Sequence, residues 1–118
     1  MKILLASSDR DLLECYKILL EADLGQTVTA FDGTQVLSLL SSEAFDTAVL
    51  DDELPRIEFG KLINQAHEKN IPVIALTNGA DTGQTQADAY LKYPFDYDKI
   101  KRTLIKTLSD AGKEDGNE

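Results

Sequence analysis

Several residue types are scarce in this sequence, and each shortage excludes a class of protein or site. There is one cysteine, Cys15, so no disulfide can form within the chain. With His67 as the single histidine, the sequence contains no His/Cys cluster and supports neither a zinc site nor a Cys–His nucleophile. No apolar run reaches the roughly 18 residues of a membrane-spanning helix, and the short apolar start does not have the features of a signal peptide. We therefore expect a cytoplasmic protein without a membrane contact.

Basic residues are also few. Lys and Arg together number 12 against 21 Asp and Glu, which gives a formal net charge of −9. A nucleic-acid-binding surface would need a basic stripe, and bases gather only in the last predicted helix, at Lys99, Lys101, Arg102 and Lys106. We interpret this group as a solvated helix face, with a docking patch for an acidic protein as the less favoured alternative. No nucleic-acid partner is expected.

Glycine is absent from the loop after the first predicted strand, where Ser7, Ser8 and Asp9 follow an apolar run. A flavodoxin-type FMN site would need a loop rich in Gly and Thr there, and no G-x-x-x-x-G-K-[ST] phosphate loop occurs in the sequence. The triplet "DTG" at 81–83 matches the aspartic-protease motif but lacks the β-rich context of that motif. We therefore expect no organic cofactor and no enzymatic activity.

What the sequence does contain is an alternation of short apolar strands and amphipathic helices. The predicted strands cover 3–6, 26–31, 47–51, 71–77 and 89–93. Helices are predicted over 11–22 and 97–109, around 36–40 and around 59–66. Strands that alternate with helices at this spacing imply right-handed crossovers and a parallel sheet with helices on both faces. The predicted fold is a five-stranded doubly wound α/β domain, and its most apolar strand, 71–77, is expected to be central.

The segment 78–88 breaks this alternation. It holds two glycines and many short polar residues at the place where a helix should follow the fourth strand. The fourth helix is therefore expected to be shortened or absent. We expect a single domain over 1–110 and a polar, disordered tail over 111–118. Cys15 lies within the apolar pattern of the first helix and is expected to be buried or half-buried there.

The stretch "DTAVLDDELPRIEFG" at 46–60 joins a buried strand, an acid at the end of that strand and a Leu-Pro turn. In this register the sequence resembles the receiver domains of two-component response regulators, and the resemblance extends over 2–109. It implies that Asp51 stands at the phospho-accepting aspartate, Thr77 at the hydroxyl residue that bonds the phosphoryl group, and Tyr90 at the switch aromatic. It also implies a protein partner, either a histidine kinase or a downstream signalling protein, and leaves a homodimer open.

The resemblance fails at the residues that handle charge. Ser7 and Ser8 stand where receivers carry the two acids that hold Mg²⁺, and Tyr93 stands where they carry a lysine. Mg²⁺ prefers carboxylate ligands in octahedral geometry, so its binding here is expected to be weak or absent. The remaining candidate ligands are Asp9, Asp51 and Glu53.

The polar residues of this region also have purely structural interpretations. Ser8 and Asp11 form a pattern like a capping box, and Asp9 can equally be the cap of the first helix. Thr77 is equally well explained as the last residue of its strand. Asp52 is expected to be a solvent-facing loop acid beside Asp51.

Three hypotheses about function follow. The favoured one is an atypical pseudo-receiver that acts as a phosphorylation-independent protein-interaction module, because a lone carboxylate lacks the charge compensation that phosphoryl transfer needs. The second is a functional receiver that a histidine kinase phosphorylates at Asp51, with weak or altered Mg²⁺ dependence. The third is a binder of small ligands in a neutral pocket lined by the hydroxyls of Ser7, Ser8, Thr77 and Tyr93.

Overall fold

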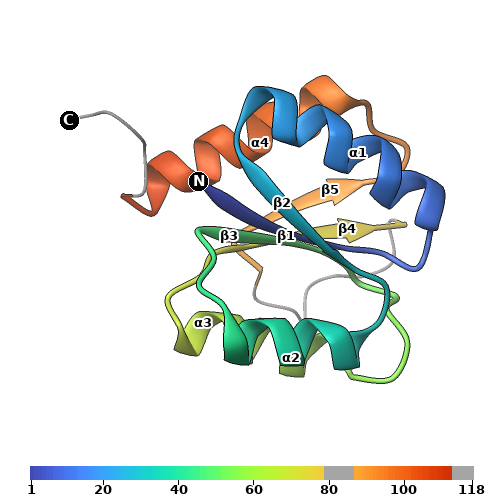
Figure 1. The fold of residues 1–118 in the computed structure, drawn as a ribbon, viewed down its shortest axis with the longest axis vertical. Helices are drawn as coiled ribbons and strands as arrows, with labels where there is room; N and C mark the ends of the chain where they lie inside the picture. The colour runs from blue at the N-terminus through green and yellow to red at the C-terminus, as the bar shows by residue number, and fades with distance from the viewer. Residues whose placement is uncertain (79–86, 113–118) are drawn as a thin grey trace.

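The computed structural model describes residues 1–78 and 87–112. Within them, five parallel strands form one sheet in the order β2-β1-β3-β4-β5 (Figure 1). The strands are β1 (Lys2–Ala6), β2 (Gln26–Ala30), β3 (Thr47–Asp51), β4 (Val73–Thr77) and β5 (Ala89–Lys92). The helices of the described residues are α1 (Arg10–Asp23), α2 (Gly33–Ser42), α3 (Phe59–Glu68) and α4 (Tyr97–Asp110). The predicted fold class is confirmed.

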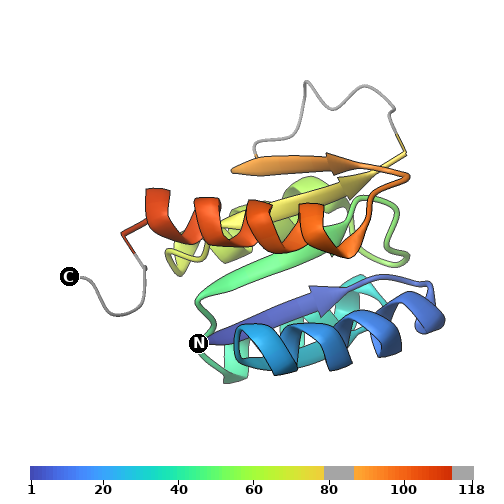
Figure 2. The same ribbon diagram turned by 90° about the horizontal axis from the view of Figure 1, so that it is seen from above.

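The helices form two layers, one on each face of the sheet. α1 and α4 lie together on one face, and α2 and α3 lie together on the other, as Figure 1 and Figure 2 show. Along β1, Ile3 and Leu5 pack into the core beneath α1 and α4, whereas Leu4 and Ala6 pack into the core beneath α2 and α3. Because both faces of the sheet are covered, the middle residues of its interior strands are consecutively apolar instead of alternating between apolar and polar, and the polar residues of β3 and β4 stand at the strand ends.

The fourth strand starts later than its apolar pattern predicts. β4 begins at Val73 and not at residue 71, because Pro72 has no N–H to give to the ladder. The Pro72 carbonyl still accepts a hydrogen bond from the Ala48 N–H, with N and O 3.0 Å apart. β4 is buried along its whole length, as an interior strand should be, but the middle strand of the sheet is β3.

The structure of α1 decides two sequence interpretations. Asp9 is the N-cap, because its Oδ1 accepts a hydrogen bond at 3.1 Å from the backbone N–H of the third helical residue, whereas Ser8 is exposed. The prediction for Cys15 is wrong, since this side chain is exposed. Leu13 and Leu20 form the buried face of α1, and at about 100° per residue Cys15 lies on the opposite side of the helix.

Two sequence predictions fall largely on residues that the structure does not describe. One is the expectation that the helix between β4 and β5 is shortened or absent. It concerns 78–88, of which 79–86 lie outside the described residues. The tail from 113 onward lies outside them as well. Among the residues that are described, no helix is long and apolar enough to cross a membrane.

Candidate functional site

The carboxyl ends of the parallel strands meet at one edge of the sheet. There Ser7 follows β1, Asp51 ends β3, Thr77 ends β4 and Tyr93 follows β5. In open α/β sheets this edge is where ligands bind. Asp51 is 9% exposed and Ser7 is fully buried, so the pair lies below the surface of this edge.

The Asp51 carboxylate accepts three hydrogen bonds within the described residues, and all three donors are neutral. Its Oδ2 accepts one from the Ser7 hydroxyl, with Oγ and Oδ2 3.3 Å apart, and one from the Tyr93 hydroxyl, with Oη and Oδ2 3.0 Å apart. Its Oδ1 accepts the backbone N–H of Glu53 at 2.9 Å. Sequence reasoning treated Asp51 as a lone carboxylate and missed these partners. The one signal for them is that both hydroxyls stand at the carboxyl ends of parallel strands.

Tyr93 reaches Asp51 from the segment that follows β5. Its backbone N–H donates to the Thr77 carbonyl at 2.7 Å, and its ring lies against Phe95, with the ring centroids 4.8 Å apart. Burial raises the pKa of the Tyr93 hydroxyl, and the charge of Asp51 together with the hydrogen bond to it raises this pKa further. The hydroxyl is therefore protonated at neutral pH and acts as a donor. In the small-ligand hypothesis Ser7 and Tyr93 line a pocket, whereas in the structure both are bonded to Asp51.

Asp52 is not the solvent-facing loop acid that the sequence predicts. Its backbone N–H donates to the Leu76 carbonyl at 2.9 Å, which continues the pairing of β3 with β4 and turns the Asp52 side chain away from that of Asp51. Burial raises the pKa of the Asp52 carboxyl, as do the charges of Asp51 and Glu53, while a hydrogen bond with the Thr77 side chain lowers it. Within the described part of the chain, the buried Oδ1 of Asp52 has no hydrogen-bond partner.

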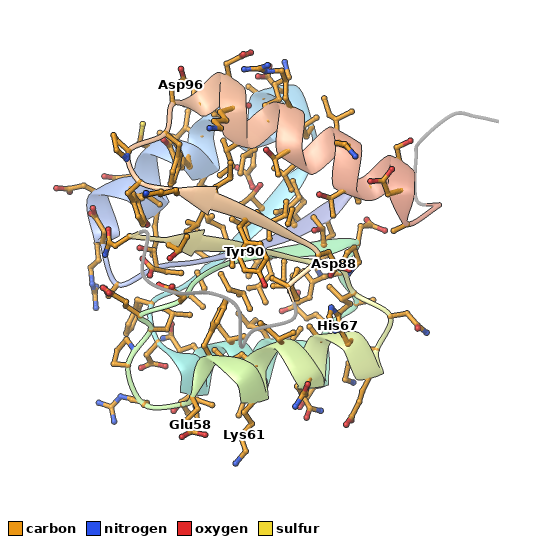
Figure 3. All side chains as sticks on the ribbon, turned by 180° about the vertical axis from the view of Figure 1, so that it is seen from behind. Glu58, Lys61, His67, Asp88, Tyr90 and Asp96 are labelled. Atoms are coloured by element: carbon orange, nitrogen blue, oxygen red, sulfur yellow. The ribbon has the colours of Figure 1, made fainter. Side chains whose placement is uncertain are left out.

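The other two residues that the resemblance singles out have different surroundings. Thr77 is 4% exposed at the end of β4, and its side chain is bonded to Asp52. Tyr90 lies on β5 and is 39% exposed (Figure 3). Its hydroxyl accepts the Ala87 N–H, with N and Oη 3.3 Å apart. The roles of Thr77 as phosphoryl sensor and of Tyr90 as switch aromatic stay predictions.

The acidic residues of this edge do not fit the Mg²⁺ that the resemblance implies. Asp9 Oδ1 caps α1, and Glu53 Oε1 accepts the side-chain amide of Asn78 at 3.2 Å. Both oxygens of Asp51 accept hydrogen bonds. In the described part of the chain, no three His, Cys, Asp or Glu side chains form a group that could hold a metal ion. Asp9, Asp51 and Glu53 form no preformed Mg²⁺ site among these residues, and the prediction that Mg²⁺ binding through them is weak or absent stays a prediction.

The bases of α4 are largely paired with acids. The pairs, measured from Nζ or Nε to Oδ2, are Lys101–Asp23 at 3.4 Å, Arg102–Asp98 at 2.8 Å and Lys106–Asp110 at 3.1 Å. Exposed pairs of this kind contribute little to stability. They do offset the positive charge of the helix, which agrees with its interpretation as a solvated face.

No protein-family model matches the chain. Among curated proteins, the chain is 37% identical over 103 residues to the transcriptional regulatory protein CpxR of Escherichia coli, an alignment that covers 80% of this chain and 43% of CpxR. It is 30% identical over 118 residues to the transcriptional regulatory protein CrdR of Helicobacter pylori, which covers 92% of this chain and 55% of CrdR. The chain thus spans about half the length of the curated relatives it matches.

Solved structures show the same fold. The receiver domain of Francisella response regulator 1452 superposes with a TM-score of 0.82 at 26% identity, covering 92% of this chain and 97% of that domain. A CheY-like response regulator receiver domain protein from Methanospirillum hungatei has a TM-score of 0.86 at 24% identity, covering 95% and 96%. Taken together with the parallel sheet and its strand order, these likenesses identify the chain as a receiver domain of the response-regulator family.

Proposed function

We propose that this receiver domain is a pseudo-receiver, which acts as a protein-interaction module independently of phosphorylation. The observation that carries the proposal is the state of Asp51. Its carboxylate accepts hydrogen bonds from two hydroxyls and one backbone N–H, and among the described residues no Lys or Arg forms an ion pair with it.

The charge around Asp51 opposes phosphoryl transfer. An incoming phosphoryl group brings negative charge against a carboxylate, and catalysis depends on cations that offset this repulsion. The hydroxyls of Ser7 and Tyr93 donate hydrogen bonds but carry no positive charge. Asp52 and Glu53 follow directly in sequence and add negative charge to the same loop. The repulsion is therefore not compensated by the side chains that contact Asp51.

The partner in this proposal is a protein in the cytoplasm, either a histidine kinase or a downstream signalling protein. Receiver domains are signalling modules, and the curated relatives are named as transcriptional regulatory proteins. A net charge of −9 disfavours direct contact of this domain with nucleic acid, so any output to DNA would pass through another protein segment.

The test is treatment of the chain with acetyl phosphate and Mg²⁺, followed by intact-mass measurement. We expect no mass gain at any Mg²⁺ concentration, and a receiver domain already known to react with acetyl phosphate, treated in parallel, shows whether the reagent is active. A stable gain of one phosphoryl group that Asp51→Asn abolishes would overturn the proposal and establish the alternative, a functional receiver phosphorylated at Asp51. Thermal unfolding with Mg²⁺ and beryllofluoride is the second measurement, and we expect no shift.

A further inference from the structure

We infer that Asp51 is a structural fastening point, whose carboxylate ties the end of β1 and the segment after β5 to the end of β3. We call Asp51, Ser7 and Tyr93 the Asp51 latch. The inference rests on the proposed function, because an aspartate that does not accept a phosphoryl group is free to be kept for the stability of the fold.

The latch adds side-chain links at the ends of the strands, and between β3 and β5 it links two strands that do not pair through the backbone. β3 pairs with β1 and β4, and β5 pairs only with β4. The Tyr93 hydroxyl passes the end of β4 and reaches Asp51 across 42 positions of sequence, and the Ser7 hydroxyl reaches it across 44. A single carboxylate oxygen, Oδ2, receives both bonds. The ends of β1, β3 and β5 are thereby linked by side chains.

Both arms of the latch continue to α1. On one arm, Ser7 Oγ accepts the Asp9 N–H at 3.1 Å, and Asp9 caps the first turn of α1. On the other arm, the Tyr93 ring lies against Phe95, whose ring lies against Tyr16 of α1 with centroids 6.1 Å apart. Loss of the Asp51 carboxylate therefore loosens the entry of α1 as well as the strand ends.

Burial increases the contribution of the Asp51 hydrogen bonds to the stability of the fold. Ser7 is fully buried and Asp51 is 9% exposed, so water cannot readily replace a lost partner. Hydrogen bonds to a charged group are stronger than neutral ones, and a buried hydroxyl left without its acceptor bears the full cost of its desolvation. Removal of the carboxylate takes this charged acceptor from the fully buried Ser7 hydroxyl and from the half-buried Tyr93 hydroxyl.

The sign of the stability change separates a latch from a site kept for chemistry. In a site kept for chemistry, function is maintained at the expense of stability, and replacement of a crowded acid commonly stabilises the fold. In a latch, the same replacement removes favourable bonds and destabilises the fold. The two readings of Asp51 therefore predict opposite shifts of the melting temperature.

The experiment measures Tm for Asp51→Ala, Ser7→Ala, Tyr93→Phe and the double variant Asp51→Ala/Tyr93→Phe in the 118-residue chain. We expect each single variant to lower Tm by about 4 °C or more. The double variant should lie close to Asp51→Ala alone, because Asp51→Ala already removes the charged acceptor of the Tyr93 hydroxyl. Two variants are the controls and should shift Tm less. Tyr90→Phe removes a hydroxyl from an exposed tyrosine of β5, and Glu14→Ala removes an exposed carboxylate from α1.

An unchanged or raised Tm in Asp51→Ala, or additive losses in the double variant, would overturn the latch. If Asp51→Ala does not fold, the Tm values of Ser7→Ala and Tyr93→Phe decide the test, because both variants keep the Asp51 carboxylate. Failure of the latch is distinct from failure of the proposed function. A phosphorylated wild type whose Asp51→Ala variant is destabilised refutes only the pseudo-receiver, and an unphosphorylated wild type whose Asp51→Ala variant is stabilised refutes only the latch.

Discussion

The chemistry of a carboxylate depends on the charge of the groups that touch it, and Asp51 illustrates this at the scale of single residues. Serine and tyrosine hydroxyls satisfy both lone pairs of Oδ2 without bringing a cation. If the chain had kept a lysine at position 93 with serines at 7 and 8, that ammonium would face a single acid. In the proposed pseudo-receiver, the neutral residues Ser7, Ser8 and Tyr93 are consistent with one another, because together they would leave Asp51 without further charges that a metal has to offset.

Asp52 gives a residue-scale prediction about pH. Burial and the neighbouring charges raise the pKa of its carboxyl above the ordinary value of 3.8. Folding therefore favours the protonated form: the contribution of this group to stability is present below pH 3.8 and is lost as pH rises through the higher pKa of the folded state. At pH 7 the ionised carboxylate destabilises the fold. We expect Asp52→Asn to raise the free energy of unfolding at pH 7 by about 1 kcal/mol, and to raise it less at pH 3.5.

Chemical unfolding of Asp52→Asn at the two pH values checks this, with the exposed Glu14→Gln as a control for loss of charge. A lower stability at pH 7, or a gain of equal size at both pH values, would contradict the assigned cause.

Sequence reasoning predicted the position of Asp51 at the end of a buried strand, but not what touches it. Local patterns report which residues end a strand, and they do not report which side chains from 42 or 44 positions away converge there. The prediction that Asp52 faces solvent was wrong for a related reason. Its neighbour Asp51 ends the assigned strand, yet the pairing with Leu76 continues one residue further and half-buries the Asp52 side chain.

At the scale of elements, the carboxyl end of α3 is closed by a Schellman motif. The Asn70 N–H donates to the His67 carbonyl at 2.9 Å, and the Ile71 N–H donates to the Ala66 carbonyl at 3.0 Å. Asn70 has a φ of 61°, in the left-handed region that asparagine and glycine tolerate better than other residues. The helix end therefore depends on the backbone preference of one residue.

We expect Asn70→Ala to lower the free energy of unfolding by about 1 kcal/mol, because alanine is strained at this φ. Asn70→Gly should leave it nearly unchanged, since glycine adopts the same backbone without strain. Asn64→Ala, at an exposed position inside the same helix, is the matched control and should be neutral or slightly stabilising because alanine has the higher helix propensity. Urea unfolding of the three variants measures this. Equal losses at positions 64 and 70 would show that the backbone conformation of Asn70 is not the cause.

The ends of helices and strands could be predicted well where N-cap residues or strand-breaking residues mark them. Asp32 and Asp96 cap α2 and α4 through bonds to backbone N–H groups, and both stand in turns that the sequence marks with "DG" and "PFD". The late start of β4 depends on Pro72, whose effect on the ladder outweighs the apolar pattern. The N-cap of α3 is Glu58, whose side chain makes no capping hydrogen bond. Only the apolar spacing from Phe59 onward therefore predicts this helix.

At the scale of the whole molecule, the fold could be predicted because alternation of strands and helices leaves few topologies. Right-handed crossovers and burial on both faces then fix a parallel sheet between two helical layers. The strand order places β2 and β5 at the two edges of the sheet. The strand order cannot be obtained from periodicity alone: the apolar pattern of 71–77 indicates an interior strand, which β4 is, but does not report that β3 is the middle strand.

The strand order leads to a prediction about amide hydrogen exchange. β3 pairs on both sides, so its successive N–H groups enter one ladder or the other, whereas β5 pairs only with β4 and has only four residues. Amides of an edge strand open with less loss of packing than those of a central strand. We expect the slowest exchange in β1 and β3 and faster exchange in β5, measured by NMR. β2 provides an internal comparison, because it is also an edge strand but has five residues. Exchange in β5 as slow as in β3 would mean that the edge is covered by something other than its neighbour in the sheet.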